Sequence, residues 1–154
     1  YVILMGYVVG GVSRGLLVAI VVTLVSMFFT DLHIHSYLVV LSVVLMTSIL
    51  FALAGFINAV YANSFDDISI IPTFVLTPLI YLGGVFYSMD LLPDFWAGVS
   101  KLNPLVYVVN AFRYGVLGVS DVSLPIAFGM IALFTVIAFS YSMHLLNSGK
   151  RLRQ

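Results

Sequence analysis

Long stretches without a charged residue dominate the pattern of apolar and polar positions along this chain. Four such runs cover residues 15–30, 32–65, 68–89 and 122–149. A helix that crosses the bilayer core needs about 20 apolar residues, so the last three runs are long enough by themselves. The first is long enough if it starts near residue 10 and Arg14 lies at the membrane edge, with its side chain extended to the headgroups. We therefore predict spans at about 10–30, 37–62, 68–88 and 122–147.

A fifth stretch, residues 90–121, is too polar for the bilayer core and too apolar for an ordinary loop. Asn103 followed by Pro104 indicates a helix start, with Asn as the N-cap and Pro at the first helical position. A short helix is therefore predicted from Pro104 to about Leu117. A companion helix is predicted from Pro93 to about Leu102. The expected fold is an all-α integral membrane protein: four transmembrane helices and a re-entrant pair of short helices on the outer side.

Composition supports the membrane assignment. Of 154 residues, 62% are apolar and 8% are charged, where a soluble domain carries about 25% charged residues. The mean hydropathy is +1.19. The formal net charge is zero with only six Lys and Arg, so the chain lacks the basic surface that nucleic acid requires. The absence of cysteine excludes disulfides and thiolate metal sites within this sequence.

The basic residues near the span ends predict the orientation. Lys150, Arg151 and Arg153 form the only basic cluster, and such clusters favour the cytoplasmic side. Four spans then place both ends of the chain in the cytoplasm and residues 90–121 on the outer side.

Few side chains are candidates for chemistry. Arg113 lies in the amphipathic segment, and we weigh an ion pair with Asp90, Asp94 or Asp121, or a lipid phosphate contact, against a substrate contact. Asp31, His33 and His35 alternate in the first outer loop and are potential metal ligands. No fourth ligand is evident there, so a solvated loop is the simpler interpretation and no metal site is predicted.

Two overlapping glycine patterns occur at the start of the first span. They are Gly6 with Gly10 and Gly11 with Gly15. Such spacing permits close approach of a neighbouring helix. A flexible start of the span is the alternative, because Gly10 and Gly11 are adjacent and weaken a helix.

The motifs of catalysis are missing. The only Gly-Lys pair, Gly149 and Lys150, lacks the earlier glycine of a phosphate-binding loop. The sequence has no GxSxG or HExxH motif and no glutamate. We therefore predict no catalytic residue, no cofactor and no nucleotide site, so any ATP chemistry must come from a partner.

The stretch from Phe65 to Gly118 resembles the signature region of ABC-2 type transporter permeases, in particular a bacterial inner-membrane, YadH-like subgroup. The resemblance extends through the whole chain. The matching elements are Pro72 and Pro78, Gly83 and Gly84, Leu92 with Pro93, Asn103 with Pro104, and Arg113.

The resemblance implies that residues 1–154 are the C-terminal portion of a permease in the bacterial inner membrane, with a coupling helix and two spans missing before them. It further implies a homodimer that exports a drug-like, lipid-linked or saccharide substrate with a separate ATP-binding cassette ATPase. The re-entrant helices would form an outer gate or line the substrate path through Phe95, Trp96, Tyr107 and Arg113.

Other classes remain open on the residues alone. A non-transporting membrane scaffold or accessory subunit also fits four spans without catalytic groups. Half of a secondary transporter would require acidic or histidine side chains in mid-span, and mid-span acids are absent.

Overall fold

The computed structural model describes residues 1–31, 33–82 and 93–149, and all regular structure in these ranges is helical. Four stretches are long and apolar enough to cross a membrane, which confirms the predicted four-span, all-α fold. Gly83 and Gly84, the end of the predicted third span and the basic tail lie outside the described residues. The elements are α1 (Val2–Phe29), α2 (Tyr37–Tyr61), α3 (Phe65–Ile71), the π-helical turn η1 (Pro72–Leu76), α4 (Thr77–Leu82), α5 (Asp94–Ser100), α6 (Pro104–Leu117) and α7 (Leu124–Ser148).

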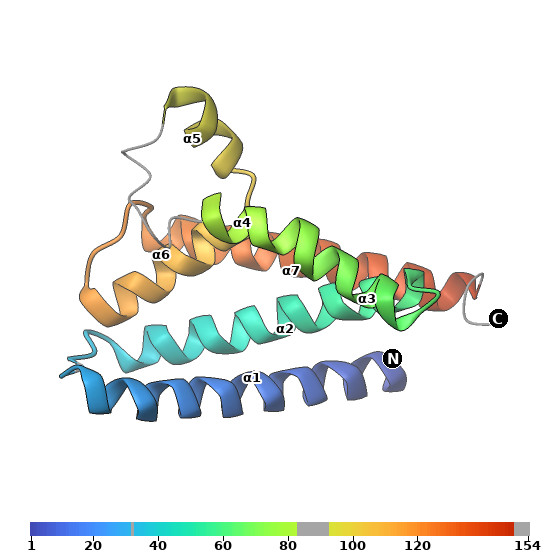
Figure 1. Ribbon diagram of the computed structural model, residues 1–154, viewed down its shortest axis with the longest axis horizontal. Helices are drawn as coiled ribbons and strands as arrows, with labels where there is room; N and C mark the ends of the chain where they lie inside the picture. Colours follow the sequence, from blue (N-terminus) through green and yellow to red (C-terminus); the bar gives the residue numbers. More distant parts are fainter. Residues whose placement is uncertain (32, 83–92, 150–154) are drawn as a thin grey trace.

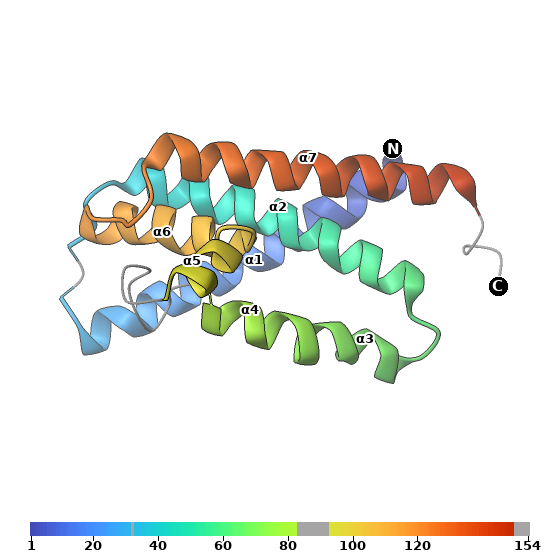
Figure 2. The same cartoon turned by 90° about the horizontal axis from the view of Figure 1, so that it is seen from above.

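Helix α2 is the centre of the bundle, and it packs against α1, α6 and α7 (Figures 1 and 2). One core cluster lies toward the loop between α1 and α2, where Val43 of α2 meets α6 and α7. A second cluster lies toward the chain ends, where Leu53 and Phe56 of α2 meet Leu4 of α1 and residues of α7. The first residue of α1 and the end of α7 lie toward the same end of the bundle (Figure 1).

Glycine determines how closely α1 approaches α2. A Cβ atom at Gly11 would lie 2.5 Å from the Ala52 Cβ, and one at Gly15 would lie 2.2 Å from the Ser48 Oγ. These contacts show that the second glycine pattern serves close helix packing. A Cβ atom at Gly6 or Gly10 would meet nothing within 4 Å, so the first glycine pattern makes no close contact with another described helix.

Helix α1 is longer than its predicted span. It begins at Val2 and continues through both adjacent glycines to Phe29, so Gly10 and Gly11 do not form a flexible start. Arg14 lies opposite the middle of α2, because its neighbour Gly15 faces Ser48. This position argues against the expectation that Arg14 lies at the membrane edge.

The third span begins earlier than predicted. The predicted span begins at about residue 68, but α3 starts at Phe65, capped by Ser64, whose Oγ accepts from the Asp67 amide. The Asp67 carboxylate in turn accepts from the Asn63 amide at 3.0 Å. This reciprocal capping and the two acidic residues of the first turn stabilise the helix start. Pro72 lies two turns into this helical stretch, and the π-helical turn begins there.

The predicted helix from Pro104 to Leu117 is confirmed by α6, and the companion helix is confirmed as the shorter α5. Asn103 caps α6, because its Oδ1 accepts from the Leu105 amide at 3.0 Å. Gly118 ends α6 with a φ of 78°, a left-handed conformation that favours glycine. Helix α6 lies beside α2 and α7, whereas α5 stands away from the bundle (Figure 1).

The surface of the bundle is apolar. Large hydrophobic side chains of α1 and α7 are exposed along the lengths of these helices, among them Leu17, Val21, Leu24, Leu133 and Ile137. A surface of this kind is stable in hydrocarbon and not in water, so the fold defines a multi-pass membrane protein.

Candidate functional site

The four predicted gate residues do not form one cluster. Phe95 and Trp96 of α5 are 71% and 46% exposed and pack edge to face, with ring centroids 5.3 Å apart. Tyr107 of α6 is 7% exposed and belongs to the core. Its hydroxyl donates to the Lys101 carbonyl at 2.6 Å. The aromatic rings therefore divide into an exposed pair on α5 and a packed ring on α6.

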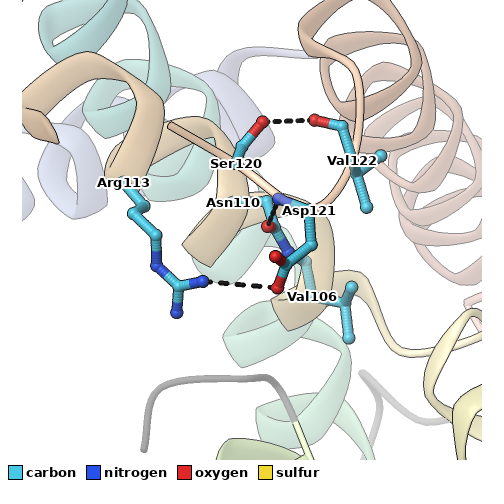
Figure 3. Close-up of polar contacts among 6 residues, drawn as sticks. All are labelled: Val106, Asn110, Arg113, Ser120, Asp121 and Val122. Atoms are coloured by element: carbon cyan, nitrogen blue, oxygen red, sulfur yellow. Dashed lines mark hydrogen bonds and ion pairs between the residues drawn. The ribbon is translucent and has the colours of Figure 1, made fainter. Parts of the chain in front are cut away.

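Arg113 pairs with Asp121, one of the three acidic residues considered for it. Its Nη1 lies 3.4 Å from the Asp121 Oδ2 (Figure 3). Asp121 belongs to the loop that links α6 to α7. Asn110, one turn before Arg113 on α6, is 1% exposed and binds this loop from the protein interior. Its Oδ1 accepts from the Asp121 amide at 2.9 Å, and its Nδ2 donates to the Val106 carbonyl. The link between α6 and α7 is thus fixed by a buried amide and a partly exposed ion pair.

The loop between α1 and α2 is attached to the end of α6. The amides of His35 and Ser36 donate to the carbonyls of Val116 and Gly115, which are among the last carbonyls of α6 and have no helical partner. The His35 ring packs edge to face on Tyr114. Among the residues that the structure describes, no group of three His, Cys, Asp or Glu side chains is arranged to hold a metal ion.

The third span is attached to the rest of the bundle by two asparagine side chains. Pro72 has no amide hydrogen for the carbonyl of Ile68, four residues earlier. The Nδ2 of Asn58 in α2 donates to this carbonyl at 2.9 Å. Near the other end, the Nδ2 of Asn103 donates to the Leu79 carbonyl at 2.7 Å. No residue of α3, η1 or α4 is buried, and these two bonds attach the span to α2 and to the start of α6.

A groove between α1 and α2 contains the only arginine of the first span. Its cavity has a volume of about 730 Å³. Arg14, Tyr7, Thr47 and Ser48 supply polar groups to a lining that otherwise consists of glycine and apolar side chains. The Thr47 hydroxyl oxygen is buried and has no hydrogen-bond partner in the described part of the chain. The groove therefore combines one cation, hydroxyl groups and apolar walls.

Sequence reasoning missed two of these features. Asn58 and Asn110 attach neighbouring segments, but an isolated asparagine gives no sign in a sequence of which carbonyl or amide it meets. The position of Arg14 inside a helix could have been predicted, since Val2, Ile3 and Leu4 already continue the apolar pattern before residue 10.

The four long helices and their apolar surface define a multi-pass membrane protein. The model of the ABC-2 type transporter family matches residues 1–117, and the chain belongs to this family. No solved structure matches it.

Two relatives show how far the similarity extends. The chain is 52% identical over 153 residues to the inner membrane transport permease YadH of Escherichia coli K12, and this alignment covers 99% of the chain and 60% of YadH. It is 27% identical over 114 residues to nodulation protein J of Rhizobium leguminosarum bv. viciae, covering 74% of the chain and 44% of that protein. The chain thus spans about 60% of the length of its YadH relatives.

Proposed function

We propose that this chain is the C-terminal portion of the permease subunit of an ATP-driven exporter. The observation that carries the proposal is its 52% identity, over nearly its whole length, to a protein described as a transport permease. Family membership across residues 1–117 supports the same assignment. The chain itself is then a transport subunit and not an enzyme, and a separate ATP-binding cassette ATPase supplies the energy.

The arrangement in the membrane is part of the proposal. Residues 1–154 lie in the bacterial inner membrane with both described chain ends toward the cytoplasm, because the basic tail follows α7. Helices α5 and α6 then form a re-entrant pair on the outer side. The exposed rings of Phe95 and Trp96 are available there to contact substrate, a drug-like, lipid-linked or saccharide molecule, as it leaves a dimer of two permease subunits.

Co-purification with an ATPase tests this function. The full-length permease is expressed with a candidate ATP-binding cassette ATPase, purified through a tag on the permease, and reconstituted in lipid. We expect the ATPase to remain bound and its turnover to respond to transported compounds. The matched control carries a substitution of the phosphate-loop lysine in the ATPase, which removes turnover and leaves the complex intact. A permease that never retains an ATPase, with no ATP-dependent flux, would instead support a scaffold or accessory subunit.

Reporter fusions test the orientation separately. A reporter after Gln154 should register the cytoplasm, and one inserted beside Asp94 should register the outer side. The reverse result would overturn the proposed orientation without affecting the family assignment.

A further inference from the structure

Arg14 lies beside the middle of α2. Its neighbour Gly15 faces Ser48. Ser48 is 11 residues after the start and 13 before the end of α2, or about 16 and 20 Å at 1.5 Å per residue. The hydrocarbon core is about 30 Å thick, so a residue at this depth is about 15 Å from either headgroup layer. Extension of the side chain to the membrane surface therefore does not explain this arginine.

A guanidinium at this depth requires an anionic or strongly polar partner. Arg14 has no ion pair with any residue in the described ranges 1–31, 33–82 and 93–149. The sequence also has no charged residue between 32 and 65, so α2 supplies none. The partner must therefore come from outside the part of the chain that the structure describes.

The surroundings of Arg14 indicate the chemistry of that partner. The guanidinium donates two parallel hydrogen bonds to a phosphate, sulfate or carboxylate group. Thr47, on the same cavity, has a buried hydroxyl that lacks an acceptor. The walls beside these groups are apolar, with Val18, Phe51 and Ala52 among them. A volume of about 730 Å³ is within the range of small-molecule sites, roughly 300–1,000 Å³.

We propose that the groove between α1 and α2 binds the acid group of an amphiphilic anion at Arg14 while that anion crosses the membrane. The apolar walls contact its hydrocarbon part. A resident phospholipid keeps its headgroup at the membrane surface, whereas a molecule in transit brings its charge to mid-depth. The occupant is therefore cargo rather than bilayer lipid. This proposal names the cargo class and so rests on the proposed function.

Photolabelling without nucleotide tests the site. The full-length permease is placed in nanodiscs of zwitterionic phosphatidylcholine and exposed to an alkyl phosphate with a photoreactive group on its chain. The matched probe has the same chain and an alcohol headgroup. We expect saturable labelling of α1 and α2 by the phosphate probe, mapped by mass spectrometry, and weak unsaturable labelling by the alcohol. Equal labelling by both probes would overturn the proposal.

Charge substitutions assign the binding to Arg14. Arg14→Gln should lower labelling by the phosphate probe about tenfold, and Arg14→Lys, which keeps the charge, should stay within about threefold of the unsubstituted protein. Lys101→Gln removes the same charge at an exposed position and should leave labelling unchanged. Full labelling of Arg14→Gln, or an equal loss in Lys101→Gln, would overturn the assignment.

A steric substitution provides a test that does not alter charge. Gly10→Leu adds a side chain where nothing lies within 4 Å and where the residue lines the groove, so it should reduce labelling. Gly129→Leu on α7, which is equally open but remote from the groove, is the control and should not. Equal labelling of both variants would contradict the proposal.

Two further outcomes would contradict the proposal. If Arg14 pairs with a carboxylate elsewhere in the full-length protein, Arg14→Gln will lower the melting temperature and leave probe labelling unchanged. If the site holds bilayer lipid, phosphatidylglycerol in the nanodisc will displace the probe, whereas we expect no displacement. Binding is measured without ATP or the ATPase, so failure here leaves the proposed function intact, and failure to retain an ATPase leaves the binding result intact.

Discussion

Helix α2 and the third span are both long and apolar, yet they are held by different forces. Helix α2 contributes Val43, Leu50, Leu53 and Phe56 to the interior and contacts helices on several sides. The third span, from Phe65 to Leu82, buries no residue in the part of the chain that the structure describes, and it accepts hydrogen bonds from the amides of Asn58 and Asn103. Shape complementarity fixes α2 in one position, whereas a segment with so little buried surface is expected to be held more loosely. Length and hydropathy alone therefore do not distinguish a firmly packed span from a loosely packed one.

Substitutions at the close contact between α1 and α2 should change the free energy of unfolding most. Gly11→Ala places a Cβ 2.5 Å from the Ala52 Cβ, and overpacking of this kind costs about 1–3 kcal/mol. Gly6→Ala adds the same atom where nothing lies within 4 Å, and it should stabilise by about 0.5–1 kcal/mol through helix propensity alone. Unfolding of the full-length protein in detergent measures both. Effects of the same sign would contradict the packing of α1 on α2.

Substitution of Asn103 should give the next largest loss of stability, because this residue caps α6 and also binds the third span. Asn103→Ala removes the bonds to the Leu105 amide and the Leu79 carbonyl, and loss of an N-cap costs about 1–2 kcal/mol. Asn147→Ala, on the exposed end of α7, is the matched control. Hydrogen exchange should rise at the start of α6 and in α4 for the first variant only. An unchanged α4 would show that the Leu79 bond does not hold the third span.

Substitution of Asn58 should give the smallest loss of stability, and the size of this loss should depend on whether residue 72 is proline. Asn58→Ala should cost about 0.6 kcal/mol, the average for polar side-chain bonds between membrane helices. In a Pro72→Ala background the new amide hydrogen can reach the Ile68 carbonyl, so Asn58→Ala should then cost almost nothing. A double-mutant cycle measures this coupling. Equal costs in both backgrounds would mean that Asn58 does not compensate for the proline.

Much of the fold follows from the sequence, because long charge-free apolar runs are stable in lipid and Asn-Pro favours a helix start. The start of α6 at Pro104 is an example. The early start of α3 is also encoded, in the capping residues Ser64 and Asp67, although the predicted span begins only at about residue 68. For the ion pair of Arg113, the sequence leaves three acidic candidates. The choice among them depends on the path of the loop between α6 and α7. The positions of Asn58, Asn110 and Thr47 relative to their neighbours depend on tertiary packing, which a sequence pattern does not specify.

Distance measurements between spin labels test the contrast between α2 and the third span most directly. The 154-residue sequence has no cysteine, so introduced pairs can be labelled selectively once any cysteine in the rest of the full-length permease is replaced by serine. One pair joins Leu41 of α2 to Val136 of α7, and the other joins Leu41 to Phe74, all at exposed positions. The full-length permease is measured in nanodiscs with its ATPase, with and without trapped ATP. We predict that the first distance stays narrow and constant while the second is broader and shifts by several ångströms, as expected for a loosely held element. Equal shifts of both pairs, or a third span as fixed as α7, would contradict the account.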